Sequence, residues 1–163
     1  MKRANVVQRT MQRVASMRPV AFVFRHTFHR IDRALYRLLG RHTVSGFVAG
    51  VPNVMLTTTG ARTGRKRTVP LVGVPIDDGV AIVGTRFGSP HHPARYHNLL
   101  ADPFAELETQ GGTTTAVVAR EVPDGDEYDA IMRAADATYS GFPIYRRRIT
   151  ARRVPVFVLQ PVA

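Results

Sequence analysis

Residues 54–71 read VMLTTTGARTGRKRTVPL and decide how the chain folds. The first six of them combine β-branched and apolar side chains, which predicts a strand over residues 54–59. Gly60 and Gly64 enclose a short polar loop and give its backbone the freedom that a tight turn requires. A second strand follows from Thr68, so the stretch predicts a β-hairpin with a polar tip.

Four cations crowd the tip of this hairpin: Arg62, Arg65, Lys66 and Arg67. Like charges this close repel one another, and a protein tolerates them best when an anion lies among them or when water screens them. Glycine-containing loops also let backbone N–H groups approach a phosphate. Two interpretations therefore remain open, an anion-binding hairpin and a solvated basic turn.

The composition of the 163-residue chain is that of one globular domain with a substantial core. There is no cysteine, which excludes disulfides and thiolate metal sites and fits a reducing, cytoplasmic compartment. No apolar run reaches membrane-spanning length, and no segment has the order of parts of a signal peptide. The net charge of +11 predicts attraction to nucleic acid, anionic lipid or an acidic small molecule, and the predominance of arginine suits recognition of phosphate and carboxylate.

The basic charge is concentrated near the N-terminus, where residues 1–42 hold ten of the 23 lysines and arginines and a single acid, Asp32. Over residues 20–39, an apolar stripe and a basic stripe both recur at helical spacing, which predicts a basic amphipathic helix. Its apolar face either packs on the domain or lies on an anionic membrane surface. We therefore divide the chain into a basic N-terminal helical segment, residues 1–45, and a main domain, residues 46–163.

The rest of the chain is predicted to be mainly β. Strands are expected over residues 68–76, 80–85, 104–110, 113–122 and 154–159, helices over residues 92–101 and 124–138, and an irregular segment over residues 139–153. Pro70 and Pro75 favour an edge position for the first of these strands. Ile131, Ala134 and Ala135 are expected to form the inner face of the second helix. The order lacks the alternation of a parallel α/β sheet and favours a small, mostly antiparallel barrel.

Residues that carry familiar catalytic chemistry are scarce. The spacing of His91, His92 and His97 does not place three metal ligands on one helix face, and Ser89 lies outside a nucleophile motif. What remains is the arginines and a set of aromatic residues: Phe87, Tyr96, Tyr139, Phe142 and Tyr145. Such a set suits a protein that holds a cofactor and leaves the chemistry to it, and the same aromatic residues could equally fill a core.

Three separate blocks of the sequence resemble the deazaflavin-dependent nitroreductase family: LTTTGARTGRKRTVPL, VAIVGTRFGSPHHPARYHNLLADP and YSGFPIYRRRITARRVPVFVLQP. The likeness extends over residues 54–161. It implies a split β-barrel in an α+β chain, related to the FMN-binding barrels. It also implies binding of coenzyme F420, a deazaflavin with a phosphate and an oligoglutamate tail. The reduced cofactor would pass hydride to a small-molecule acceptor such as a quinone, a nitroaromatic compound or an enone.

The resemblance also implies a set of cofactor-binding residues. In the first block, Arg62 and Arg67 would hold the phosphate and carboxylates, while the backbone of residues 68–70 would face the ring. In the second block, Arg86 and Gly88 would lie on the phosphate side. The full implied set is Thr57, Arg62, Thr63, Gly64, Arg65, Arg67, Thr68, Val69, Pro70, Leu71, Arg86, Gly88, Tyr96 and Asn98.

The third block places Tyr139, Phe142 and Tyr145 where several relatives carry tyrosines that line the acceptor pocket. Phe142 has no hydroxyl, so the proton that completes the product would come from Tyr139, Tyr145 or water. Arg95, in the second block, stands where the family commonly has an aromatic residue. The resemblance implies no metal.

Two other classes of function remain open. An FMN-dependent barrel enzyme would share the fold, but FMN has one phosphate and no glutamate tail and so explains fewer arginines. A non-enzymatic nucleic-acid-binding barrel fits the charge but would need aromatic residues exposed on a sheet face. We expect a monomer or homodimer in the cytoplasm, peripheral on the inner membrane surface if residues 20–39 bind lipid.

Overall fold

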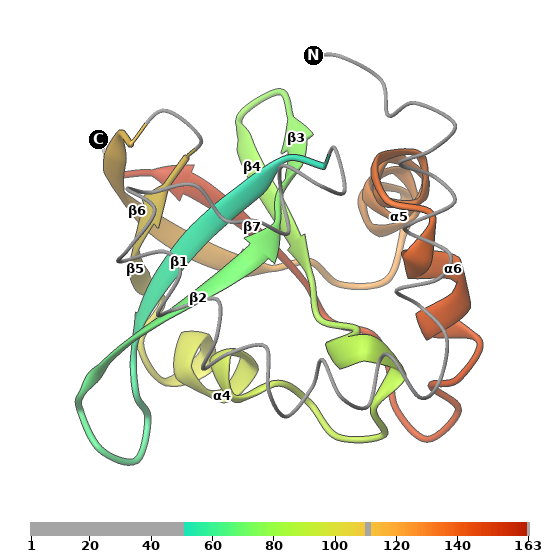
Figure 1. Cartoon of the computed structure of the whole chain (residues 1–163), viewed down its shortest axis with the longest axis horizontal. Coiled ribbons are helices and arrows are strands. Elements are labelled where there is room, and N and C mark those ends of the chain that lie inside the picture. The colour runs from blue at the N-terminus through green and yellow to red at the C-terminus, as the bar shows by residue number, and fades with distance from the viewer. Residues whose placement is uncertain (1–50, 110–111, 163) are drawn as a thin grey trace.

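The computed structural model describes residues 51–109 and 112–162, which form one curled antiparallel sheet with helices at its sides (Figure 1). The strands are β1 (Asn53–Thr59), β2 (Lys66–Val72), β3 (Val74–Ile76), β4 (Gly79–Val83), β5 (Phe104–Glu108), β6 (Thr114–Glu121) and β7 (Val156–Pro161). The helices are the 3-10 turn η1 (Arg86–Gly88), α4 (Ala94–Ala101), α5 (Asp126–Thr138) and α6 (Gly141–Arg146). The predicted basic helix over residues 20–39 and the predicted boundary between residues 45 and 46 lie outside the described residues.

The sheet curls because its two edge strands follow one another in the chain. The strand order is β2-β1-β5-β6-β7-β4-β3, and only Gly73 separates β2 from β3. The two edges therefore converge at Gly73, which confirms the predicted barrel-like architecture. The prediction of one strand over residues 68–76 is wrong, since two strands on opposite edges replace it. Pro70 and Pro75 lie on these edge strands, as predicted, because a missing N–H is tolerated there.

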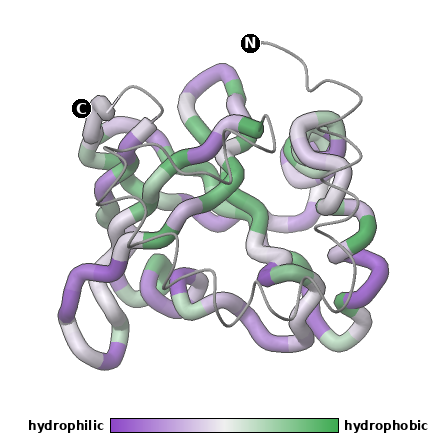
Figure 2. The backbone as a smooth tube through the Cα atoms, in the orientation of Figure 1, coloured by the Kyte–Doolittle hydropathy of each residue, from purple (hydrophilic) through white to green (hydrophobic). Residues whose placement is uncertain are grey.

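Strand β7 is buried on both faces and joins two hydrophobic clusters. Val156 and Val158 pack in the cluster that includes residues of α5, whereas Phe157 and Leu159 pack in the cluster that includes Leu99 of α4. Successive side chains of a strand point to opposite faces, so a strand between two clusters must be apolar at every position. Figure 2 shows the same contrast along the chain, with hydrophobic central strands and a hydrophilic β1–β2 loop.

Helix α5 packs one face on the sheet, close to the prediction. Ile131 and Ala135 are buried as expected. Ala134 is half-buried and packs against the same cluster, so all three predicted positions face the core. Met132 is a further buried residue of this face that was not predicted.

Helix α6 replaces part of the irregular segment predicted over residues 139–153. The helix contains Gly141 and Pro143, but Pro143 lies in the first turn, where a missing N–H costs no helical hydrogen bond. An ion pair between Arg146 and Asp136 of α5, at 2.5 Å, joins the two helices. The short helix is therefore stabilised by tertiary contacts rather than by its own propensity.

Two further structural findings bear on the class of protein. None of the helices in residues 51–109 and 112–162 has both the length and the apolar character needed to cross a bilayer. In the same part of the chain, no three histidine or acidic side chains converge as metal ligands would.

Candidate functional site

The β1–β2 hairpin projects beyond the sheet, and its loop faces solvent (Figure 1). Backbone hydrogen bonds close this loop. The amides of Thr63 and Gly64 donate to the carbonyl of Gly60 at 3.0 and 2.7 Å, and the Gly60 amide donates to the carbonyl of Arg65 at 2.9 Å. Gly64 has a φ of 64°, so the turn needs a glycine as predicted. The loop backbone is thus well defined, while its arginine side chains are exposed.

The strand register places the cations of the hairpin on two faces of the sheet. Lys66 pairs with Glu106 of β5 at 3.3 Å, on what we call the outer face. Arg67 lies opposite Thr58, whose side chain is buried on the inner face, toward α4. Because successive residues of a strand alternate, Arg67 lies on this inner side. Within the described ranges, Arg67 and the loop residue Arg62 have no carboxylate partner, unlike Lys66.

Thr57 lies on the outer face and is not brought together with Arg67. Its Oγ1 atom lies 2.8 Å from that of Thr68 on the opposite strand. In residues 51–109 and 112–162, no second strand pairs with the free edge of β2. That the backbone of residues 68–70 faces the cofactor ring, as the resemblance implies, stays a prediction.

Asn98 of α4 ties the hairpin loop to the body of the domain. Its Oδ1 accepts from the amide of Ala61 at 3.0 Å, and its Nδ2 donates to the hydroxyl of Thr58 at 2.9 Å. The side chain is buried. Both ends of the side-chain amide bind protein groups, so Asn98 holds the loop that carries Arg62 against the body of the domain.

A second group of cations gathers at the opposite end of α4, where β4 leads through η1 into the helix. The exposed Arg86 donates to the carbonyl of His92 at 3.0 Å, and Arg95 donates to the carbonyl of Val83 at 3.3 Å. Arg152, which precedes β7, donates to several backbone carbonyls of the same junction. Among the described residues, none of these three guanidinium groups pairs with a carboxylate. We call Arg86, Arg95 and Arg152 the junction arginines.

The pKa values of this group reflect burial and mutual repulsion. The pKa of Arg95 is lowered to about 10, first by burial and then by the nearby charges of Arg152 and Arg86. Burial and the charge of Arg86 also lower the pKa of Arg152. The causes of these shifts show that the three side chains repel one another, and a bound anion would relieve that repulsion.

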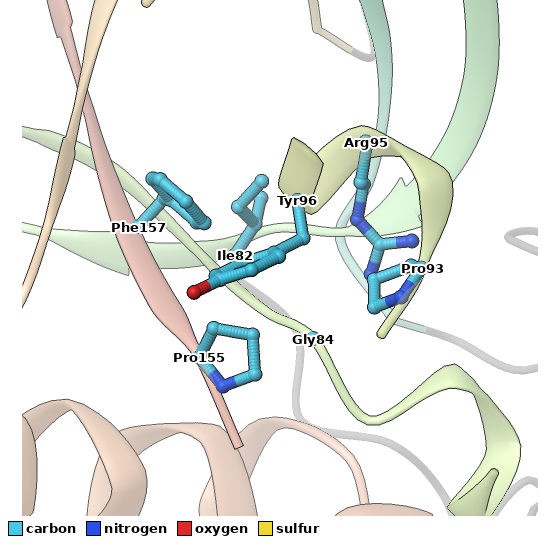
Figure 3. Close-up of a pocket in the computed structure, with 7 residues that line it drawn as sticks. All are labelled: Ile82, Gly84, Pro93, Arg95, Tyr96, Pro155 and Phe157. Carbon is cyan, nitrogen blue, oxygen red and sulfur yellow. The ribbon is translucent and has the colours of Figure 1, made fainter. Parts of the chain in front are cut away.

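Tyr96, for which the resemblance implies a cofactor contact, packs between α4 and β7. Its ring stacks on His92 at a centroid distance of 4.2 Å and meets Phe157 edge-on at 6.0 Å. It borders a cavity of about 10 Å³, which has room for about one water molecule. The cavity is lined by Ile82, Gly84, Pro93, Arg95, Tyr96, Pro155 and Phe157 (Figure 3). Tyr96 therefore lines the same small cavity as Arg95, one of the junction arginines.

The aromatic residues predicted for the acceptor pocket come together around α6. The hydroxyl oxygens of Tyr139 and Tyr145 lie 3.2 Å apart, and Phe142 meets the ring of Tyr139 edge-on at 5.3 Å. Phe87 of η1 packs edge-on against Tyr145 at 5.7 Å. Phe142 and Tyr145 are only 5% and 3% exposed, whereas Tyr139 is half-buried. Tyr139 is therefore the member of the predicted trio that a ligand can touch.

Burial raises the pKa of both tyrosines, and the neighbouring hydroxyl of Tyr139 raises the pKa of Tyr145 further. Both side chains are therefore neutral hydroxyls at physiological pH, and each can hold a proton. The Tyr139 hydroxyl has that of Tyr145 as its hydrogen-bond partner.

The hairpin loop is held by Asn98 in the C-terminal half of α4, whereas Arg86 and Arg95 bind carbonyls near the N-terminal end of the same helix. This arrangement fits a ligand with several separated negative charges. The sequence model of a protein family described as F420H(2)-dependent quinone reductase matches residues 28–161. The chain belongs to this family. Coenzyme F420, with its phosphate and oligoglutamate tail, carries negative charges of the kind that the two arginine groups suit.

Relatives of known name agree with this membership. The F420H(2)-dependent quinone reductase of Mycobacterium tuberculosis H37Rv is 31% identical over 132 residues, which cover 80% of this chain and 87% of that protein. A solved F420-H2 dependent reductase, FDR-A, has 34% sequence identity and a TM-score of 0.60, covering 67% of this chain and 94% of its own. A structure described as a domain-swapped dimer has 31% identity and a TM-score of 0.62, covering 80% and 96%.

Membership in the F420H(2)-dependent quinone reductase family confirms three predictions from the sequence. The fold is a split β-barrel of the α+β class. The protein is an oxidoreductase that transfers hydride from a reduced deazaflavin to a quinone-type acceptor. Its cofactor is coenzyme F420.

Proposed function

We propose that this F420H(2)-dependent quinone reductase holds its cofactor along the open edge of β2, between the hairpin loop and the junction arginines. The observation that carries this proposal is the pair of arginine groups at the two ends of α4, which have no carboxylate partner in residues 51–109 and 112–162. When bound, reduced F420 supplies the hydride. Arg62 and Arg67 would bind one part of its anionic chain, and Arg86, beside Gly88, would bind another.

The remaining cofactor contacts follow from the edge position of β2. The backbone of Thr68, Val69 and Pro70 would face the ring system, since no strand of the described chain covers that edge. Asn98 would hold the hairpin loop in place by accepting the hydrogen bond from the amide of Ala61. Thr57 and Tyr96 would support these elements without touching the ligand, because one lies on the outer face and the other packs against β7.

Tyr139 would give the proton that completes quinone reduction. A quinone that accepts a hydride becomes a hydroquinone anion, and one proton then yields the neutral hydroquinone. The Tyr139 hydroxyl is neutral at physiological pH and half-buried at the edge of the aromatic cluster. Tyr145 stabilises the phenolate left on Tyr139 by the hydrogen bond between their oxygens until solvent restores the proton.

A steady-state assay tests this function. Under anaerobic conditions, the purified full chain should oxidise reduced F420 when menadione is added, and the visible absorbance of the oxidised cofactor should return. If the Tyr139 hydroxyl acts as a general acid, Tyr139→Phe should lower kcat by a factor of about 10²–10³ and leave the KM for F420 unchanged. Binding of F420 without any oxidation by menadione would contradict the proposed acceptor class.

We also propose that residues 20–39 bring the enzyme to an anionic membrane surface, where a lipid-soluble quinone would be available. The basis is the basic amphipathic pattern of that segment, with about 1 kcal/mol expected per basic residue near anionic lipid. The full chain should pellet with anionic vesicles, less so at high salt, and a chain that begins at Gly46 should not. If both stay in the supernatant, the membrane proposal is wrong.

A homodimer is our proposal for the assembly state. A relative with 31% identity is described as a domain-swapped dimer, and a curled sheet with open edge strands offers a surface for a second copy. Light scattering coupled to size-exclusion chromatography should give a mass of two chains, and a mass of one chain would overturn the proposal.

A further inference from the structure

Arg152 makes an unusual set of contacts that the sequence did not reveal. Its Nη2 atom donates to the carbonyl of Gly84 at 3.1 Å, of Thr85 at 3.3 Å and of Ser89 at 3.0 Å. Its Nε atom also donates to Ser89 at 3.3 Å, and its Nη1 atom donates to the carbonyl of Arg153 at 3.1 Å. One guanidinium group thus joins the two ends of the segment over residues 84–89.

The segment between those carbonyls has a strained backbone. Arg86 and Phe87 have φ values of 45° and 56°, in the left-handed region that side chains other than glycine rarely adopt. Two consecutive residues in this region persist only where the surroundings hold them. The turn has internal hydrogen bonds from Gly88 to Thr85 and from Ser89 to Arg86, both at 3.0 Å.

This turn sends its two side chains to opposite parts of the site. Arg86 donates to the carbonyl of His92 in the segment that precedes α4, and it belongs to the junction arginines. Phe87 packs on Tyr145, the partner of the Tyr139 hydroxyl. The geometry of this one turn therefore sets both the anion-binding side and the aromatic side of the candidate site.

We infer that Arg152 is a positioning residue that locks the strained turn over residues 84–89, and so fixes Arg86 for the cofactor and Phe87 for the tyrosine pair. The inference rests on the proposed function for the role of Arg86. A lysine has a single donor nitrogen, so it would lose the hydrogen bonds that Nε makes to Ser89 and Nη1 makes to Arg153, and its ammonium group alone would have to hold both ends of the turn. The cost of burying the guanidinium next to Arg86 is offset by its hydrogen bonds to carbonyl dipoles.

Arg153 provides a matched control. It is the next residue in the chain and is half-buried like Arg152. It binds the carboxylate of Asp124 at 2.7 Å and the carbonyl of Val122 at 2.7 Å, and it lies 4.6 Å from the ring centre of Tyr128. These contacts join β6, α5 and the segment before β7, away from the turn. Arg153→Ala should therefore remove a similar number of contacts without disturbing residues 84–89.

The first measurement needs no cofactor. Amide hydrogen exchange of Gly88 and Ser89 reports the two hydrogen bonds that close the turn. Both amides should exchange at least tenfold faster in Arg152→Ala, remain fast in Arg152→Lys, and be unchanged in Arg153→Ala. Unchanged exchange in Arg152→Ala would overturn the inference, whatever the protein binds. If Arg152→Ala does not fold, Arg152→Lys serves for the same comparison.

The second measurement is a double-mutant cycle with F420 affinity as the readout. Arg86→Ala and Arg152→Ala should each weaken binding about tenfold or more. The double variant should bind about as weakly as Arg86→Ala alone, because Arg152 acts through the side chain that is already gone. Guanidinium ions at millimolar concentration should partly restore F420 affinity in Arg152→Ala and not in Arg153→Ala.

If the losses of affinity in the two single variants multiply in the double variant, the inference is overturned, because Arg152 would then act on the cofactor through its own charge. Absence of F420 binding in the parent chain would instead refute the proposed function and leave the exchange result to decide.

Discussion

Replacing Gly79 by alanine is expected to lower the free energy of unfolding by roughly 3–5 kcal/mol, the largest stability effect of a single methyl group that we predict. Gly79 opens β4 with a φ of 149°, and a Cβ atom there would lie 2.2 Å from the carbonyl oxygen of Leu159. That oxygen belongs to β7, which pairs with β4 through Val80 and Leu159, so neither backbone can move away freely. Chemical denaturation of the parent chain and the variant measures this loss of free energy of unfolding, provided that the two have the same m-value.

Gly125 is the matched control for this substitution. Its φ is 144°, nearly the same as that of Gly79, but a Cβ atom there would have no neighbour within 4 Å. Gly125→Ala should therefore show the backbone cost alone, about 1–3 kcal/mol, without the steric clash. Equal losses at both positions would show that β7 yields to the added methyl group, and that the β4–β7 pairing is softer than the structure indicates.

Replacing Arg62 and Arg67 together by alanine is expected to reduce F420 affinity by about 3–6 kcal/mol, with each charge-assisted hydrogen bond contributing about 1.5–3 kcal/mol. Both side chains are exposed and have no carboxylate partner among the described residues. Their removal should therefore leave the free energy of unfolding nearly unchanged. Fluorescence titration at fixed ionic strength measures the affinity, and chemical denaturation checks the fold.

The same hairpin supplies two controls for this result. Lys66 has the same sign of charge but is held by Glu106 on the outer face, so Lys66→Ala should have little effect on affinity. Arg65, at the end of the loop, should show a smaller loss than Arg62. A loss in Lys66→Ala as large as that in Arg67→Ala would mean that the hairpin attracts anions through its net charge and holds none of them at a defined position.

Much of the fold could be predicted because local chemistry determined it. Gly60 and Gly64 marked the first turn, and the two prolines marked edge strands because a missing N–H is tolerated there. The sequence could not show that the chain passes from one sheet edge to the other at Gly73, because strand order depends on contacts between distant residues. Helix α6 was missed for the same reason, since contacts with α5 and the core outweigh its Gly141 and Pro143.

The candidate site was predictable only in part. Crowded charge identified the loop arginines, but the partner of Lys66 is 40 residues away, and only the strand register places the two side chains on one face. Arg152 carried no signal, because its partners are backbone carbonyls that any sequence would supply. The resemblance implied three pocket residues in the tail, which stay a prediction, and burial leaves Tyr139 as the most exposed of the three.

A comparison of F420 and FMN binding tests the proposed cofactor site most directly. FMN has one phosphate and no glutamate tail, so it can engage only one of the two arginine groups at the ends of α4. We expect the full chain to bind F420 at least tenfold more tightly than FMN in parallel fluorescence titrations at physiological salt, equivalent to about 1.4 kcal/mol. Binding of FMN with equal or higher affinity would contradict the assignment of both arginine groups to one extended polyanionic cofactor.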